Sequence, residues 1–277
     1  MRWNTPAVWS SPREDSSIRI LIRGAGDLAT GVAWELFQRG HDVLMTEVAE
    51  PLAVRRLVSF SRAVYEGSAE TDGVHAVLAR SLDEALSALG RREIPVMVDK
   101  QAAVRESFGP DVLVDGIMAK HNLGTRRTDA PLVIALGPGF TAGEDCDVVI
   151  ETQRGETLGM PIWSGSALPN TGVPGNIGGC TTERLLRSAG TGRMEPLVSI
   201  GDPVEKGQVV ARTGGEPVRA QISGVVRGLL QEGVRVSPGL KIGDVDPRRD
   251  AELCYHISDK AHRIGEGAAE AVSQRFS

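Results

Sequence analysis

The fold is decided by one stretch near the start of the chain, IRILIRGAGDLATGVAWELF at residues 18–37. Residues 18–22 are apolar and rich in β-branched side chains, which predicts a buried parallel strand. A glycine-rich turn follows, and the apolar residues after it recur at helical spacing until Gly40, a residue type that often ends helices. The next apolar run, residues 43–45, predicts a second strand. The stretch therefore predicts a strand–helix–strand unit.

The glycine turn has the spacing of a dinucleotide-binding fingerprint. Gly24 permits the tight turn, Gly26 lets backbone amides approach a pyrophosphate, and the small side chain of Ala29 lets the helix pack closely on the strand. The start of the helix offers free N–H groups and a positive dipole end to a phosphate. We therefore expect a phosphorylated ligand at this turn.

An acidic residue closes the second predicted strand. Glu47 lies about 20 residues beyond the second glycine, where an acid in this kind of unit binds ribose hydroxyls. An acid there repels a 2′-phosphate, but the nearby cations Arg55 and Arg56 leave a ligand with a phosphorylated ribose possible. A unit of this layout that no longer binds a nucleotide is the alternative. The residues expected to bind the cofactor here are Gly24, Gly26, Asp27, Ala29, Thr30, Gly31 and Glu47.

Residues that follow the later predicted strands are further site candidates, because ligands of open α/β sheets lie beyond the carboxyl ends of the strands. Asp115, Lys120 and His121 are the candidate catalytic residues, although turn formation or plain solvent exposure explains each of them too. Gly137 and Gly139 form a second glycine turn that can offer amides to an anion. The runs that predict strands are 63–65, 74–78, 95–99, 111–115, 132–136 and 148–150, with a helix over 82–89 capped by Ser81.

The second half of the chain contains an internal repeat. The pattern G-x-x-V-x-x-G-x-x-[VI] occurs once from Gly201 to Val210 and again from Gly233 to Ile242. Short strands broken by glycine turns and repeated once predict a small β barrel-sandwich like the biotinyl and lipoyl carrier modules. Those modules carry a modified lysine on the hairpin between their halves, whereas this hairpin reads Gly-Gly-Glu-Pro at 214–217. We therefore expect neither biotin nor lipoate.

The predicted fold class is α/β, a Rossmann-like parallel sheet domain followed by a small β barrel-sandwich module. Five segments are expected. They are a disordered leader at 1–17, a Rossmann-like nucleotide-binding domain at 18–160, a Gly/Pro-rich connecting loop at 161–193, the barrel-sandwich module without a carrier lysine at 194–247, and a C-terminal strand and helix at 248–277.

Composition excludes several classes of protein. The net charge of −5 gives no attraction to nucleic acids or anionic membranes, and aromatic residues, at 4%, are too scarce for a base-stacking surface. The three cysteines form no CxxC pair, so neither a disulfide scaffold nor a metal site is expected. The start of the chain lacks the apolar core of a signal peptide, which predicts a cytoplasmic protein. A homo-oligomer stays open.

Five strings resemble the YqeB-like family, which is associated with selenium-dependent molybdenum hydroxylases. They are RGAGDLATG at 23–31, MAKHNLGT at 118–125, ALGPGFTAG at 135–143, GSALPNTG at 165–172 and KIGDVDPR at 241–248. The resemblance implies an accessory role in the maturation of a molybdenum-containing hydroxylase, similar in concept to that of XdhC-like maturation factors. It implies no catalytic residue.

Three functions follow as hypotheses. The first is an accessory factor that binds NAD(P), another nucleotide or a pterin phosphate and helps to prepare the cofactor of a molybdenum hydroxylase. The second is an NAD(P)-dependent oxidoreductase, for which Lys120 and His121 are the best acid–base candidates. The third is a docking scaffold in which the nucleotide-binding unit is vestigial.

Overall fold

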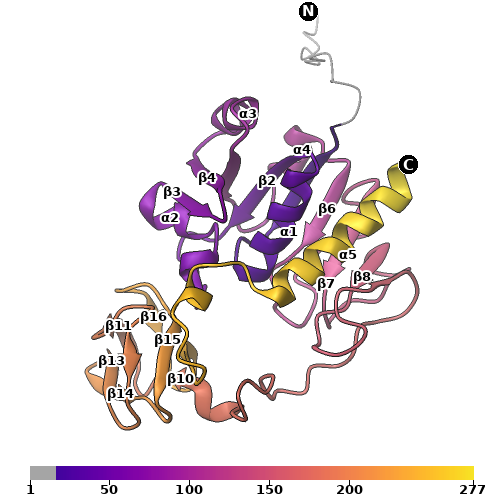
Figure 1. Ribbon diagram of the computed structural model, residues 1–277. Helices are drawn as coiled ribbons and strands as arrows, with labels where there is room; N and C mark the ends of the chain where they lie inside the picture. Colours follow the sequence, from indigo (N-terminus) through magenta and orange to yellow (C-terminus); the bar gives the residue numbers. More distant parts are fainter. Residues whose placement is uncertain (1–16) are drawn as a thin grey trace, which may run out of the picture.

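The computed structural model describes residues 17–277 and contains three β-sheets (Figure 1). The predicted leader therefore lies outside the described residues, apart from Ser17. The large sheet has nine strands. In spatial order they are β3 (Ser68–Thr71), β4 (Val74–Ala79), β5 (Ile94–Val98), β2 (Asp42–Glu47), β1 (Arg19–Arg23), β6 (Val112–Asp115), β7 (Leu132–Leu136), β8 (Val148–Ile150) and β9 (Pro161–Ile162).

Both faces of the large sheet are buried, because alternate side chains of its strands enter two separate cores. On one face, Ile20 and Ile22 pack with α1 (Asp27–Gln38) and the C-terminal helix α5 (Asp259–Phe276), which lie side by side in Figure 1. On the other face, Leu21 packs with α3 (Leu82–Gly90) and α4 (Arg105–Phe108). Ser81 caps α3 by accepting a hydrogen bond from the amide of Glu84, as the sequence predicts.

The prediction of a Rossmann-like parallel sheet is wrong. The sheet is mixed, because β3 pairs antiparallel with β4 and β9 pairs antiparallel with β8. Loops, not helices, connect β6 to β7 and β7 to β8, so the second strand–helix–strand half of a doubly wound sheet does not form. Helix α5, from the far end of the chain, covers this part of the sheet instead.

The remaining strands form two curled antiparallel sheets of four strands each. The first sheet contains β10 (Leu185–Arg187), β17 (Lys241–Asp246), β15 (Gly224–Leu229) and β12 (Pro203–Val204), in that order. The second contains β14 (Glu216–Arg219), β13 (Val209–Thr213), β11 (Gly192–Pro196) and β16 (Arg235–Val236). Their inner faces share one apolar core.

The internal repeat is visible in these two sheets. Its glycines all have positive φ, and its apolar residues Val204, Val210, Val236 and Ile242 are all buried. Each copy gives one strand to each sheet, since β12 and β17 lie in the first sheet and β13 and β16 in the second. The repeat therefore relates the two sheets to each other.

The expectation of a biotinyl/lipoyl-like module is nevertheless wrong. The strands form two separate four-stranded half-barrels, and β10 comes from the segment predicted to be a connecting loop. Strand and turn signals in a sequence do not specify how the strands group into sheets. Two further segments differ from prediction, because residues 63–65 lie in the short helix α2 (Arg62–Glu66) and the short 3₁₀-helix η3 (Glu252–Cys254) replaces the expected C-terminal strand.

One segment joins the large sheet to the antiparallel sheets. Val54 packs against the antiparallel core, and its carbonyl accepts a hydrogen bond of 2.8 Å from the amide of Leu229 in β15. Arg56, in the 3₁₀-helix η1 (Arg56–Val58), donates through Nε to the carbonyl of Leu229 at 3.1 Å. A Cβ on Gly228 would lie 2.7 Å from the Val54 side chain, so the two parts are in close contact here. Within residues 17–277, no helix has the length and apolar character needed to cross a bilayer.

Candidate functional site

A cleft of about 1020 Å³ lies between the large sheet and the antiparallel sheets. Its first wall is built by residues that follow the carboxyl ends of β1, β6, β7 and β8, among them Leu28, Met118 and Thr152. Its second wall is built by the antiparallel sheet that contains β10, β15 and β17, and the loop at 168–177 contributes a third side. The volume lies at the upper end of the range for ligand pockets.

The cleft is strongly basic, although the whole chain is acidic. Among its lining residues only Asp27 and Asp244 are acidic, and seven are basic. A cleft lined by one sign of charge between low-dielectric walls attracts ligands of the opposite charge. The basic residues are Arg55, Lys120, Arg154, Arg184, Arg227, Lys241 and Lys260, and we call the site the basic cleft.

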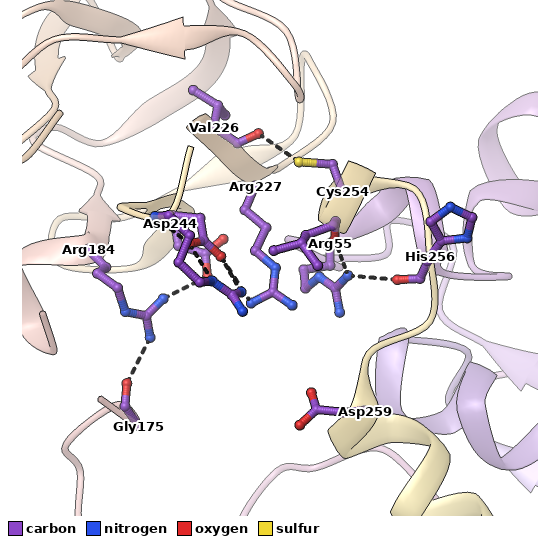
Figure 2. Close-up of polar contacts among 12 residues, drawn as sticks. Arg55, Gly175, Arg184, Val226, Arg227, Asp244, Cys254, His256 and Asp259 are labelled. Atoms are coloured by element: carbon purple, nitrogen blue, oxygen red, sulfur yellow. Dashed lines mark hydrogen bonds and ion pairs between the residues drawn. The ribbon is translucent and has the colours of Figure 1, made fainter. Parts of the chain in front are cut away.

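Three arginines of the basic cleft are almost completely buried, and we call Arg55, Arg184 and Arg227 the arginine cluster. Their side chains are 9%, 6% and 9% exposed, respectively. Figure 2 shows their guanidinium groups pointing into the same space, between Gly175 and Asp259. In each of them Nε is buried and has no hydrogen-bond partner within residues 17–277. Buried guanidinium groups normally use such donors, because desolvation is costly.

Arg55 and Arg184 are each anchored by backbone carbonyls. Arg55 donates to the carbonyls of Leu253 and His256, both at 3.1 Å, and Arg184 donates to the carbonyl of Gly175 at 3.1 Å. The Arg184 guanidinium also lies 3.7 Å from the Asp244 carboxylate. These contacts fix the orientation of two of the three guanidinium groups.

Arg227 is the least satisfied member of the arginine cluster. It lies in the middle of β15, and its nearest acid is Asp246, 3.6 Å away. Asp246 is already held by Arg248 through hydrogen bonds of 2.9 and 2.6 Å. Burial, and after it the neighbouring charge of Arg55, lowers the pKa of Arg227. The fold therefore holds a cation that its own residues do not neutralise well.

Lys260 approaches the basic cleft from the first turn of α5. Burial, and then the charge of Arg154, lowers the pKa of Lys260. Arg154 itself forms a two-bond ion pair with Asp259, at 2.8 and 3.0 Å, which lowers the pKa of Asp259 to about 2. The positive charge on this wall is thus partly neutralised, unlike that of Arg227.

Two backbone amides of the glycine turn after β1 are used by internal hydrogen bonds. The Glu47 carboxylate accepts hydrogen bonds from the amides of Ala25 and Val48, at 2.9 and 2.8 Å, and burial raises its pKa. The amide of Gly24 donates to the carbonyl of Thr46 at 2.7 Å. The structure therefore places Glu47 against the turn itself, where it holds the backbone.

The other fingerprint residues divide between packing and the cleft. A Cβ on Gly31 would lie 2.7 Å from Ala261 of α5, Ala29 packs against Gly116, and the buried Thr30 hydroxyl accepts from the amide of Phe60 at 2.9 Å. Asp27 lines the basic cleft, where its carboxylate lies 3.7 Å from Arg55. Around Gly26 there is open space, because no heavy atom lies within 4 Å of a Cβ built there.

The structure separates the three candidate catalytic residues. Asp115 is buried, pairs with Arg23 at 3.3 Å and accepts a hydrogen bond of 2.5 Å from Thr125, so it fixes the neighbouring loop. Lys120 is exposed at the rim of the basic cleft. His121 is exposed too, but it is not among the residues that line the cleft.

The second glycine turn packs against the loop after β6. A Cβ on Gly139 would lie 2.6 Å from the amide nitrogen of His121, and one on Gly137 would lie 2.5 Å from the hydroxyl of Thr152. Both glycines have positive φ. They allow close backbone contact, and of this turn only Pro138 lines the basic cleft.

Sequence reasoning missed the arginine cluster, which belongs to no motif. One signal was present, since Arg227 interrupts the apolar run GVVRGL that forms β15, all six residues of which are buried. A charge inside a fully buried strand is uncommon without a partner or a function. Arg55 appears in the sequence analysis only as a cation that leaves a phosphorylated ribose possible, and Arg184, the last residue of a three-residue 3₁₀-helix, carries no signal.

The chain is 49% identical over 253 residues to the uncharacterized protein YqeB of Escherichia coli strain K12. The match covers 91% of this chain but 47% of YqeB, so the chain spans about half the length of this curated relative. The similarity agrees with the resemblance inferred from the five strings. No protein-family model matches the chain.

Solved structures give only weak matches. An aspartoacylase family protein from Mesorhizobium loti is 13% identical with a TM-score of 0.27, over 83% of this chain and 85% of that one. A succinylglutamate desuccinylase from Silicibacter is 15% identical with a TM-score of 0.24, over 83% and 85%. Scores at this level establish no common function.

Proposed function

We propose that this chain binds a phosphate-bearing small molecule, of the nucleotide or pterin phosphate type, in the basic cleft. The observation that supports this most is the arginine cluster, three buried guanidinium groups directed into one space of about 1020 Å³ in an otherwise acidic protein. Guanidinium groups match the geometry of phosphate oxygens, and burial strengthens such pairs. The position beyond the carboxyl ends of four strands is also the usual ligand position in α/β sheets.

We propose further that the ligand is a cofactor or precursor handled during the maturation of a molybdenum-containing hydroxylase. This part rests on the resemblance to YqeB-like proteins, and the basic cleft supports it by offering room and charge for a phosphorylated cofactor. This chain, carrying an affinity tag, is then expected to retain a molybdenum hydroxylase in a pull-down from its own cells. Failure to capture a molybdenum hydroxylase, both with and without added ligand, would contradict the accessory role.

Calorimetric titration tests the binding. Purified chain is titrated with NAD, NADP and cytidine nucleotides, and any ligand that co-purifies is identified by mass spectrometry. At least one compound should bind saturably, with an affinity that falls as salt rises. Absence of binding by all of them, with the fold intact by circular dichroism, would contradict the proposal. Oxidation of bound NADH or NADPH in the presence of a substrate panel would instead support the oxidoreductase.

A further inference from the structure

We infer that the phosphate of the ligand is bound by Arg55, Arg184 and Arg227, and not by the amides of the glycine turn after β1. The inference rests on the proposed function, because it assigns the position of the phosphate within the same cleft. It predicts that the ligand carries its anionic group toward the antiparallel sheets, about β15 and β17, and its organic part toward the large sheet.

Unsatisfied hydrogen-bond donors support this assignment. The guanidinium group of Arg227 makes no hydrogen bond to any other residue in 17–277, although the side chain is buried, with only 9% of it exposed. Arg55 and Arg184 keep Nε without a partner. A buried donor without a partner is costly, and a phosphate supplies several acceptor oxygens at once. The three groups come from a loop after β2, the 3₁₀-helix η2 (Thr182–Arg184) and β15, so the tertiary structure alone brings them together.

Charge supports it as well. Two guanidinium groups, those of Arg55 and Arg227, are close enough for one to lower the pKa of the other. Within the part of the chain that the structure describes, Arg55 has a single acid within 4 Å, Asp27 at 3.7 Å, and Arg227 has only Asp246, which it shares with Arg248. The next acid, Asp244, is shared by Arg184 and Lys241 at 3.7 and 3.5 Å, so the acids compensate only part of the charge. A dianionic phosphate would neutralise the repulsion. A neutral ligand would leave it in place.

The glycine turn is less suited to the same phosphate. Its Gly24 and Ala25 amides donate to the carbonyl of Thr46 and the carboxylate of Glu47, so neither is available to a phosphate. The neighbouring cleft surface includes Leu28 and Met118, and the facing loop contributes Leu168 and Val173. These apolar side chains suit the organic part of a phosphate ester better than its charged end.

Three variants test the assignment, with inorganic pyrophosphate and the nucleotides as probes of the chain. Arg227→Gln should weaken binding about tenfold or more, through loss of charge-assisted hydrogen bonds. Arg235→Gln, an exposed arginine on β16 outside the cleft, should change affinity less than about twofold. Gly26→Ala, at the open position of the turn, should also leave the affinity unchanged.

Thermal unfolding separates a binding role from a structural one. Without ligand, Arg227→Gln should melt at the same temperature as the wild type or higher, because it removes a poorly neutralised buried charge. With pyrophosphate, the wild type should gain stability and the variant should gain little. If the wild type binds a nucleotide and Arg227→Gln binds it with equal affinity, or Gly26→Ala no longer binds it, the inference is overturned and the proposed function stands. Failure of the wild type to bind any probe would overturn the proposed function itself.

Discussion

The glycine turn at 24–31 and the arginine cluster differ in how the protein uses them. The turn has a recognisable spacing, yet Glu47 holds one of its amides and α5 covers Gly31. The three residues of the arginine cluster follow no sequence motif, yet their charges are buried and poorly paired. The motif residues thus serve mainly internal packing, whereas the poorly paired charge of the arginine cluster is the feature on which we base the proposed ligand site.

The largest effect is expected from Gly31 of helix α1, with Gly26 of the preceding turn as its control. Gly31→Ala should destabilise the fold by about 3 kcal/mol, because the new Cβ would lie 2.7 Å from the side chain and the carbonyl oxygen of Ala261. Gly26→Ala should change stability by about 0.5 kcal/mol or less, since its Cβ meets open space. Urea unfolding midpoints measure both. Equal losses would mean that the cost of Gly31→Ala does not arise from the contact with α5.

Glu47 gives the next largest effect. Glu47→Gln should cost about 2 kcal/mol of stability, because a glutamine has one acceptor oxygen and cannot serve the amides of both Ala25 and Val48. The measurement is again urea unfolding, at pH 7. A ribose-binding Glu47 predicts the opposite pattern, an unchanged midpoint and weaker nucleotide binding.

The difference in stability between the wild type and Glu47→Gln should depend on pH in a definite direction. Burial raises the pKa of Glu47 above its ordinary value, so the folded state binds a proton more readily than the unfolded state. The wild type should therefore gain stability relative to Glu47→Gln as the pH falls from 7 through the folded pKa toward 4.5. A stability difference between the wild type and Glu47→Gln that stays constant over this pH range would contradict a raised pKa for Glu47.

The sequence predicts the parts of this fold that depend on local pattern. The apolar run at 18–22 forms β1, Ser81 caps α3, and both copies of the repeat place valine or isoleucine in the core. Periodicity and turn chemistry are properties of neighbouring residues, so one sequence is sufficient to read them. They do not reveal that β3 and β9 run antiparallel at the edges of the sheet.

What the sequence does not predict depends on residues far apart in the chain. Gly31 is required by Ala261, and the arginine cluster joins three segments that share no motif. Two members could be noticed separately, Arg55 as a cation near the acid Glu47 and Arg227 as a charge inside a buried strand. The sequence therefore points to the end of the large sheet at which the basic cleft lies, but it gives no sign of the cleft's second wall.

Lys260 tests whether the cleft wall on α5 resembles the arginine cluster. Its pKa is lowered by burial, so the folded state disfavours its charge, and stability should rise as the pH increases through the folded pKa toward 10.5. Lys260→Met should then raise the stability of the ligand-free chain at pH 7 by about 1 kcal/mol. Thermal melts at pH 7 and pH 10 should show this advantage shrinking at the higher pH. A loss of stability at pH 7 would mean that Lys260 is paired internally.

Asp259 gives the smallest expected effect and sharpens the same contrast. Its pair with Arg154 is solvent-exposed, with 40% of the arginine and 73% of the aspartate side chain accessible, so Asp259→Asn should cost about 0.5 kcal/mol or less. The carboxyl pKa of about 2 means that this contribution is present above pH 4 and is lost as the pH falls toward 2. Removing the carboxylate also frees Arg154, which lines the cleft, and should raise pyrophosphate affinity about twofold at low salt. An unchanged affinity would show that the phosphate lies beyond the reach of Arg154, on the opposite wall with the arginine cluster.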